Sequence, residues 1–67
     1  MNERLRNNLK KIRILNELTQ GDLEIRTGIH QSELSRIESG VRKANIEKKR
    51  KLALVLGITE KELFPEE

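Results

Sequence analysis

A chain of 67 residues has room for one domain but little room for a deep pocket, because a chain of this length buries only about 60% of the surface that it exposes when unfolded. Cysteine is absent, which excludes disulfides and thiolate metal sites, and the formal charge of +3 is a modest basic excess that suits a polyanion but is also common elsewhere. No apolar run approaches the roughly 18 residues of a membrane span and the N-terminus lacks a signal-peptide core, so we expect a soluble, cytoplasmic protein.

The spacing of apolar residues predicts a single all-α domain over residues 1–67. No segment alternates convincingly with period two, whereas turn signals separate five helical pieces. The first helix is predicted over about residues 3–15. Leu5, Leu9 and Ile12 recur there at positions i, i+4 and i+7, which places them on one helical face.

A second helix is predicted over about residues 20–27 and a third over about residues 31–39. Thr19 is a favourable N-cap for the second helix, and Gly28 ends it because glycine accommodates a positive φ. The third helix stops at Gly40. These signals predict two helices joined by a short turn.

The remaining helices are predicted over about residues 46–56 and 60–64. Asn45 is the expected N-cap of the fourth helix and Thr59 that of the fifth, where Glu62 follows at the spacing of a capping box. Together with the three preceding helices, they predict a compact five-helix bundle.

The stretch from Leu18 to Gly40 predicts a helix-turn-helix, in which two helices cross at roughly 90–120° and the second can enter a DNA major groove. On a helical wheel the second helix of this motif buries Leu34 and Ile37. Its opposite face is polar and holds Gln31, Ser32, Ser35 and Arg36. Glutamine can pair with adenine, arginine with guanine and serine with either base. Periodicity alone does not decide between a base-reading face and an ordinary solvated face.

Several short motifs match one protein family both in residue type and in spacing along the chain. They are Leu18-Thr19-Gln20, Gly28-Ile29, Leu34-Ser35-Arg36-Ile37-Glu38-Ser39-Gly40, Leu52-Ala53, Leu56-Gly57-Ile58 and Glu62-Leu63-Phe64. Through them the chain resembles, over roughly residues 5–64, the phage Cro and repressor family of helix-turn-helix proteins, also called the xenobiotic-response-element-like group. The resemblance implies a lambda-repressor-like five-helix bundle whose third helix reads DNA. We expect a transcriptional regulator that acts as a repressor, with activation as the alternative that stays open.

Residue roles follow from the resemblance position by position. It implies that Gln20 contacts a phosphate and that Gln31, Ser32 and Arg36 face base edges. Ser35 lies on the same predicted face. It also implies an ion pair between Arg13 and Glu38 that pins the recognition helix to the first helix. The alternative for Arg13 is an ordinary exposed arginine.

A basic cluster follows the motif, with Glu47 as its only acidic residue. We expect Arg42 and Lys43 to contact phosphates, with help from Asn45 and the backbone amides at the start of the fourth helix. For Lys48–Lys51 we favour a solvated helix face, which is the usual role of such a run of charges.

Some residues depart from the family pattern. Glu24 stands where alanine is usual, so its side chain must reach solvent, find a basic partner or widen the helix crossing. Thr27 replaces an aliphatic residue, and Lys49 lies on an apolar stripe that its methylene stem can cover. Apolar residues at positions often polar in the family are either scattered surface residues or part of an oligomer surface; they are Ile14, Ile25, Leu54 and Val55.

Catalysis is poorly supported, because the only histidine, His30, has no second histidine or cysteine to pair with. We therefore expect no enzyme activity, no catalytic residue, no cofactor and no metal. The expected partner is double-stranded DNA, bound by a homodimer on a palindromic site. The dimer would use the fourth and fifth helices, where the candidate residues are Leu54, Val55, Ile58, Leu63 and Phe64. The alternative function is that of an antitoxin or a protein-interaction adaptor with the same fold, and a toxin partner would discriminate it.

Overall fold

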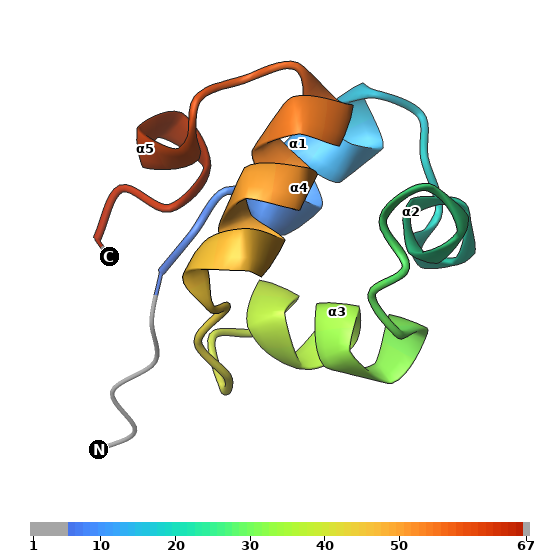
Figure 1. The fold of residues 1–67 in the computed structure, drawn as a ribbon, viewed down its shortest axis with the longest axis horizontal. Coiled ribbons are helices and arrows are strands. Elements are labelled where there is room, and N and C mark those ends of the chain that lie inside the picture. Colours follow the sequence, from blue (N-terminus) through green and yellow to red (C-terminus); the bar gives the residue numbers. More distant parts are fainter. Residues whose placement is uncertain (1–5, 67) are drawn as a thin grey trace.

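Five helices follow one another in the computed structural model, which describes residues 6–66. They are α1 (Leu9–Leu15), α2 (Gln20–Thr27), α3 (Gln31–Glu38), α4 (Ile46–Leu56) and α5 (Glu60–Leu63). Within this range the chain forms no strand, which confirms the predicted all-α fold. Figure 1 shows α4 in the centre with α5 on one side, α2 on the other and α3 below. No helix of the described residues is long and apolar enough to cross a membrane.

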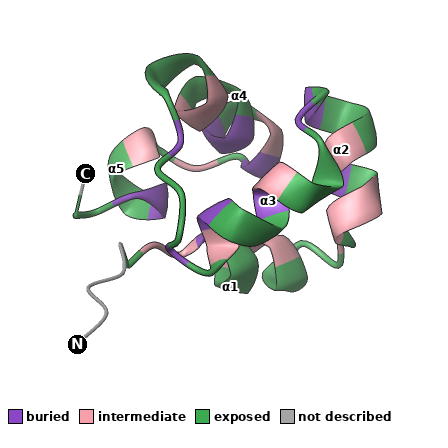
Figure 2. Cartoon of the chain, turned by 90° about the horizontal axis from the view of Figure 1, so that it is seen from below, coloured by how far each residue is buried: buried purple, intermediate pink, exposed green. Residues whose placement is uncertain are grey.

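The core draws apolar side chains from every helix and from the turns between them. Leu34 and Ile37 of α3 are fully buried, and so is Leu9 of α1. Figure 2 shows the buried residues on the inward sides of the helices. The buried apolar set is Leu9, Leu23, Ile29, Leu34, Ile37, Ala44, Leu52, Ala53, Leu56, Leu63 and Phe64. Burial of this set is the main force that holds the short helices together, since helices of this length are marginal in isolation.

The predicted start of the first helix is wrong. The apolar spacing predicted a helix from about residue 3, but α1 begins at Leu9 and residues 6–8 are not helical. Residues 3–5, including the predicted face residue Leu5, lie outside the described part of the chain. The third and fifth helices each end one residue earlier than predicted, at Glu38 and Leu63.

Two asparagines explain why the helix begins late. Asn7 accepts a hydrogen bond from the backbone N–H of Leu9 through Oδ1 (3.0 Å) and donates through Nδ2 to the carbonyl oxygen of Ile37 (2.8 Å). The backbone N–H of Asn8 donates to the carbonyl oxygen of Leu63 (2.9 Å). These contacts with the ends of α3 and α5 compete with helical hydrogen bonding, as asparagine side chains commonly do.

The middle of the chain follows its predicted caps. Thr19 accepts from the backbone N–H of Asp22 while the Asp22 carboxylate accepts from the backbone N–H of Thr19, so α2 begins with a capping box. Asn45 caps α4 in a similar way, through its side-chain oxygen. Gly28 ends α2 with a left-handed φ of 77°, which turns the chain toward α3.

Candidate nucleic-acid interface

The turn between α2 and α3 sets the angle at which α3 leaves the core. Ile29, which follows Gly28 in the turn, is 4% exposed and anchors it. Thr27 is buried, and its hydroxyl donates to the carbonyl oxygen of Leu23 (2.7 Å) and accepts from the backbone N–H of Ile29 (3.1 Å). The threonine that replaces an aliphatic residue therefore has a hydrogen-bonding role inside the turn.

Helix α3 has one buried face and one exposed face. Leu34 and Ile37 have no exposed surface and fix the helix on the core. The four residues predicted to read bases are all exposed, and they lie on this one short helix, whose outer side is green in Figure 2. They are Gln31, Ser32, Ser35 and Arg36. This is a row of donors and acceptors of the kind that can meet base edges in a major groove.

The first turn of α3 is capped by two side chains. His30 is the N-cap, and its Nδ1 accepts from the backbone N–H of Ser32 at 3.2 Å. Oε1 of Glu24, which lies in α2, accepts from the backbone N–H of Gln31 at 3.0 Å. Glu24 is only partly buried and this contact is exposed, so its carboxylate reaches solvent, which is one of the three arrangements predicted; the bond to a backbone amide was not predicted. The unusual glutamate thus links the two helices of the motif.

The opposite end of α3 is held by Arg13 and Glu38. Arg13 Nε lies 2.6 Å from Glu38 Oε2, and Arg13 Nη2 donates to Glu38 Oε1 (3.3 Å). A third guanidinium nitrogen, Nη1, donates to the carbonyl oxygen of Leu18 (2.7 Å). The Arg13 side chain is 11% exposed and that of Glu38 is 5% exposed. The alternative of an ordinary exposed arginine is therefore wrong, and α1 is tied to the end of α3.

Gln20, predicted to contact a phosphate, takes part in the same network. Its Nε2 donates to Glu38 Oε1 at 3.0 Å, and the residue is half-buried at the start of α2. A shallow hollow next to it is lined by Ser35, Ser39 and Lys10 of α1 among others. The predictions missed Lys10, although its spacing from Arg13 is that of neighbours on one helical face.

The basic residues after the motif have different surroundings. Arg42 has a side chain that is 54% exposed, and its Nε lies 3.8 Å from Glu33 Oε2. Lys48 forms an ion pair with the same carboxylate, so the predicted solvated role is wrong for this residue. The hydrogen bond from Lys48 is the main cause that lowers the pKa of Glu33, and the nearby cations lower it further. Glu33 thus connects α3 with α4 and with the loop between them.

Lys43 and Asn45 complete the predicted phosphate contacts. Both are exposed. Asn45 Oδ1 accepts from the backbone N–H of Lys48 at 2.9 Å, which is the N-cap bond of α4. The structure therefore places Arg42, Lys43 and Asn45 in one segment just after α3, beside the face that carries the predicted base contacts.

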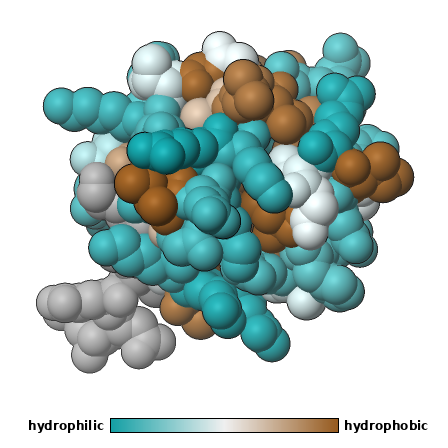
Figure 3. Space-filling view, viewed as in Figure 1, coloured by the Kyte–Doolittle hydropathy of each residue, from teal (hydrophilic) through white to brown (hydrophobic). Residues whose placement is uncertain are grey.

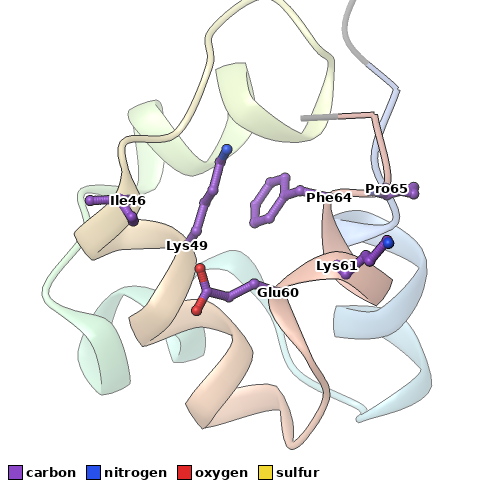
Figure 4. Close-up of a pocket in the computed structure, with 6 residues that line it drawn as sticks. All are labelled: Ile46, Lys49, Glu60, Lys61, Phe64 and Pro65. Atoms are coloured by element: carbon purple, nitrogen blue, oxygen red, sulfur yellow. The ribbon is translucent and has the colours of Figure 1, made fainter.

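A separate groove lies between α4 and α5. Figure 4 shows Lys49 extending beside the ring of Phe64, with its Nζ 5.7 Å from the ring centroid. This position agrees with the predicted role of the lysine stem as a cover for apolar surface. The groove is lined by Ile46, Lys49, Glu60, Lys61, Phe64 and Pro65.

Apolar residues at unusual positions fall into two groups. Ile14, Ile25 and Leu54 are exposed, by 55%, 85% and 83% respectively, whereas Val55 packs partly buried against the core. Figure 3 shows apolar surface as separate patches among hydrophilic side chains. Within residues 6–66, no group of three or more His, Asp or Glu side chains is placed to hold a metal ion.

Comparison with known proteins identifies the family to which the chain belongs. No curated protein matches the sequence significantly. A family model described as helix-turn-helix, of the Cro/C1 type, matches residues 9–63, which include all five helices. Proteins of this family are DNA-binding regulators of transcription rather than enzymes. Because the match spans most of the sequence and the same segment folds with α3 exposed after a tight turn, the chain belongs to the Cro/C1-type helix-turn-helix family.

Proposed function

We propose that this chain binds one specific sequence of double-stranded DNA and represses transcription from a promoter that overlaps it. One observation carries the proposal: α3 exposes a polar face while Leu34 and Ile37 are completely buried beneath it. A helix seated in this way can enter the major groove without exposing the core. The family supports DNA binding, and repression would follow from competition with the transcription machinery for the same DNA.

Each side chain of the face would have a distinct task. Gln31 would pair with adenine and Arg36 with guanine, while Ser32 and Ser35 would accept or donate at neighbouring bases. Phosphate contacts would fix the register without reading sequence. They would come from the residues on either side of the face, which are Gln20, Arg42, Lys43, Asn45 and, in addition to the predicted set, Lys10.

A homodimer on a palindromic site would supply the affinity that one short helix lacks. The two half-sites would lie about one helical turn apart, on one side of the duplex. Of the residues proposed for the dimer surface, Leu63 and Phe64 fill the core, so the contact would depend on Leu54, Val55 and Ile58. Only Leu54 is widely exposed among these, which makes the expected dimer weak in the absence of DNA.

The experiment that tests the proposal is selection of bound duplexes from a random DNA library. A common sequence should be enriched by the wild-type protein, and Arg36→Ala should lose preference at one position of it. A reporter gene with the selected sequence inside its promoter should then be expressed less when the protein is present. Failure to enrich any sequence would refute specific DNA binding, and unchanged expression would refute repression.

The alternative is an antitoxin or adaptor whose main partner is a protein. The observation that favours it is the exposure of Ile25 and Leu54, both above 80%, on helices other than α3. An adjacent reading frame for a small toxin, whose product forms a stoichiometric complex with this chain, would support it. Loss of that complex in Ile25→Ser or Leu54→Ser would locate the contact.

A further inference from the structure

We propose that Glu24 is a positioning residue for DNA reading, which holds the first residue of α3 in place and so sets where Gln31 meets the DNA. The inference rests on the proposed function above. Its basis is the hydrogen bond from the backbone N–H of Gln31 to Glu24 Oε1 (3.0 Å), which joins residues seven positions apart across the turn of the motif. A carboxylate at the N-terminus of a helix also has favourable electrostatics with the helix dipole.

The amides of the first turn of α3 are all engaged by the protein itself. Gln31 donates to Glu24, and the next amide, that of Ser32, donates to His30 Nδ1 at 3.2 Å. The two amides that follow donate to the carbonyl oxygen of His30, each at 3.0 Å. Since the first N–H groups of a helix have no partner inside it, their satisfaction by α2 and the turn fixes the end of α3. These amides therefore hold the helix and are not offered to a phosphate.

The side chain of Gln31 is seated next to the same contact. Its Nε2 lies over Gly21 in the first turn of α2, 3.6 Å from the position that a Cβ at Gly21 would take. The backbone of Gln31 is thus held by α2 through Glu24, and its amide group lies against α2 as well. Loss of the Glu24 contact would release the backbone of Gln31 from α2 and free its side chain to leave its place over Gly21.

The charge of Glu24 has a second effect that experiments can separate from positioning. None of the ion pairs between residues 6–66 includes Glu24, so its carboxylate adds negative potential near the proposed DNA face. Removing that charge should strengthen binding to any DNA. Glu24→Gln removes the charge and retains an oxygen acceptor for the Gln31 amide, whereas Glu24→Ala removes both.

The control for charge is Glu17→Gln. Glu17 is exposed in the segment that joins α1 to α2 and, unlike Glu24, makes no hydrogen bond to a residue of α3 through its side chain among the described contacts. Each variant is first shown to be folded by circular dichroism at the temperature of the assay. Binding is then measured at one salt concentration on the duplex selected by the wild type and on a scrambled duplex of equal length.

The result expected is a different pattern for each variant. Glu24→Gln and Glu17→Gln should keep the wild-type ratio of the two affinities within about twofold, because the acceptor or the whole contact is retained. Glu24→Ala should lower this ratio about five- to tenfold, as expected for a lost helix cap. The loss of sequence preference should occur at the same base position at which Gln31→Ala loses preference. The double variant Glu24→Ala/Gln31→Ala should lose no more preference at that position than Gln31→Ala alone.

Hydrogen exchange of the Gln31 amide without DNA reports the cap independently of any DNA binding. It should be slow in the wild type and in Glu24→Gln, and faster in Glu24→Ala. A wild-type ratio retained by folded Glu24→Ala would overturn the positioning role while specific binding stood. No preference of the wild type for any duplex would overturn the proposed function, and the inference with it, even if exchange showed the cap intact.

Discussion

The network around Glu38 should make a single substitution more damaging than the matching pair of substitutions. Arg13→Met keeps most of the apolar stem but removes three hydrogen bonds, two of them to Glu38. The Glu38 side chain is 5% exposed, so its carboxylate would be left buried with the Gln20 amide as its remaining partner in the network. Breaking a buried pair in this way costs about 3–5 kcal/mol.

That cost is large for a chain of this size. Domains are stable by roughly 0.05–0.15 kcal/mol per residue, which gives about 3–10 kcal/mol here. Glu38→Gln should also cost about 3–5 kcal/mol, because the Arg13 guanidinium is then buried without a counter-ion and one of the two accepting oxygens is replaced by an NH2 group that can only donate. The double variant Arg13→Met/Glu38→Gln has no stranded charge and should be more stable than Arg13→Met alone.

Urea unfolding of the four proteins measures the coupling between the two sites. The exposed pair of Arg50 and Glu60 provides the control, since its atoms lie 3.8 Å apart and its side chains are 67% and 43% exposed. Arg50→Met should change the free energy of unfolding by less than about 1 kcal/mol. Strictly additive effects of Arg13→Met and Glu38→Gln, or a double variant less stable than Arg13→Met, would refute the reasoning.

Three further predictions concern DNA, acid and assembly. Arg36→Ala should cost roughly 1–3 kcal/mol of binding free energy on the selected duplex but little on random DNA. Arg42→Ala should weaken binding to the two duplexes alike and should reduce the slope of log affinity against log salt concentration by about one unit. Binding titrations at several salt concentrations compare the two variants. Because the pKa of Glu33 is lowered from 4.5 in the folded state, its contribution to stability is present above that value and is lost as the pH falls through the folded pKa. Between about pH 6 and about pH 3, the free energy of unfolding should therefore fall less in Glu33→Gln than in the wild type. An equal fall in the two proteins would contradict this. Sedimentation should show two chains on a palindromic duplex, and a strict one-to-one complex at saturating protein would exclude the dimer.

Local signals in the sequence predicted the elements whose ends depend on near neighbours. Thr19 and Asn45 cap helices through residues three positions away, and Gly28 ends α2 by its own backbone conformation. The start of α1 depends instead on Asn7, whose partner Ile37 is 30 positions away. Apolar periodicity carries no information about such a bond, so the predicted helix began too early.

The features of the candidate site likewise fall into those that local sequence predicts and those that depend on distant residues. The exposed face of α3 follows from helical periodicity alone, because the burial of Leu34 and Ile37 dictates which side chains point outward. The contacts of Glu24 with α3 and of Lys48 with Glu33 depend on how separate helices are placed. A sequence pattern showed that Glu24 was unusual but could not name its partner, since several partners satisfy a carboxylate equally well.

The polar contacts around α3 have a consequence for how DNA would be read. Apolar packing under Leu34 and Ile37 holds the middle of the helix, but packing alone allows small rotations of a helix of only eight residues. Glu24 fixes the first residue of α3 and Arg13 fixes the last, so both ends are tied to the other helices by directional bonds. A recognition helix held at both ends loses little further freedom on binding, and less of the binding free energy is spent on ordering it. Specificity should therefore be more sensitive to these supporting bonds than overall affinity is, because the proposed phosphate contacts outside α3 would sustain affinity even when the helix shifts.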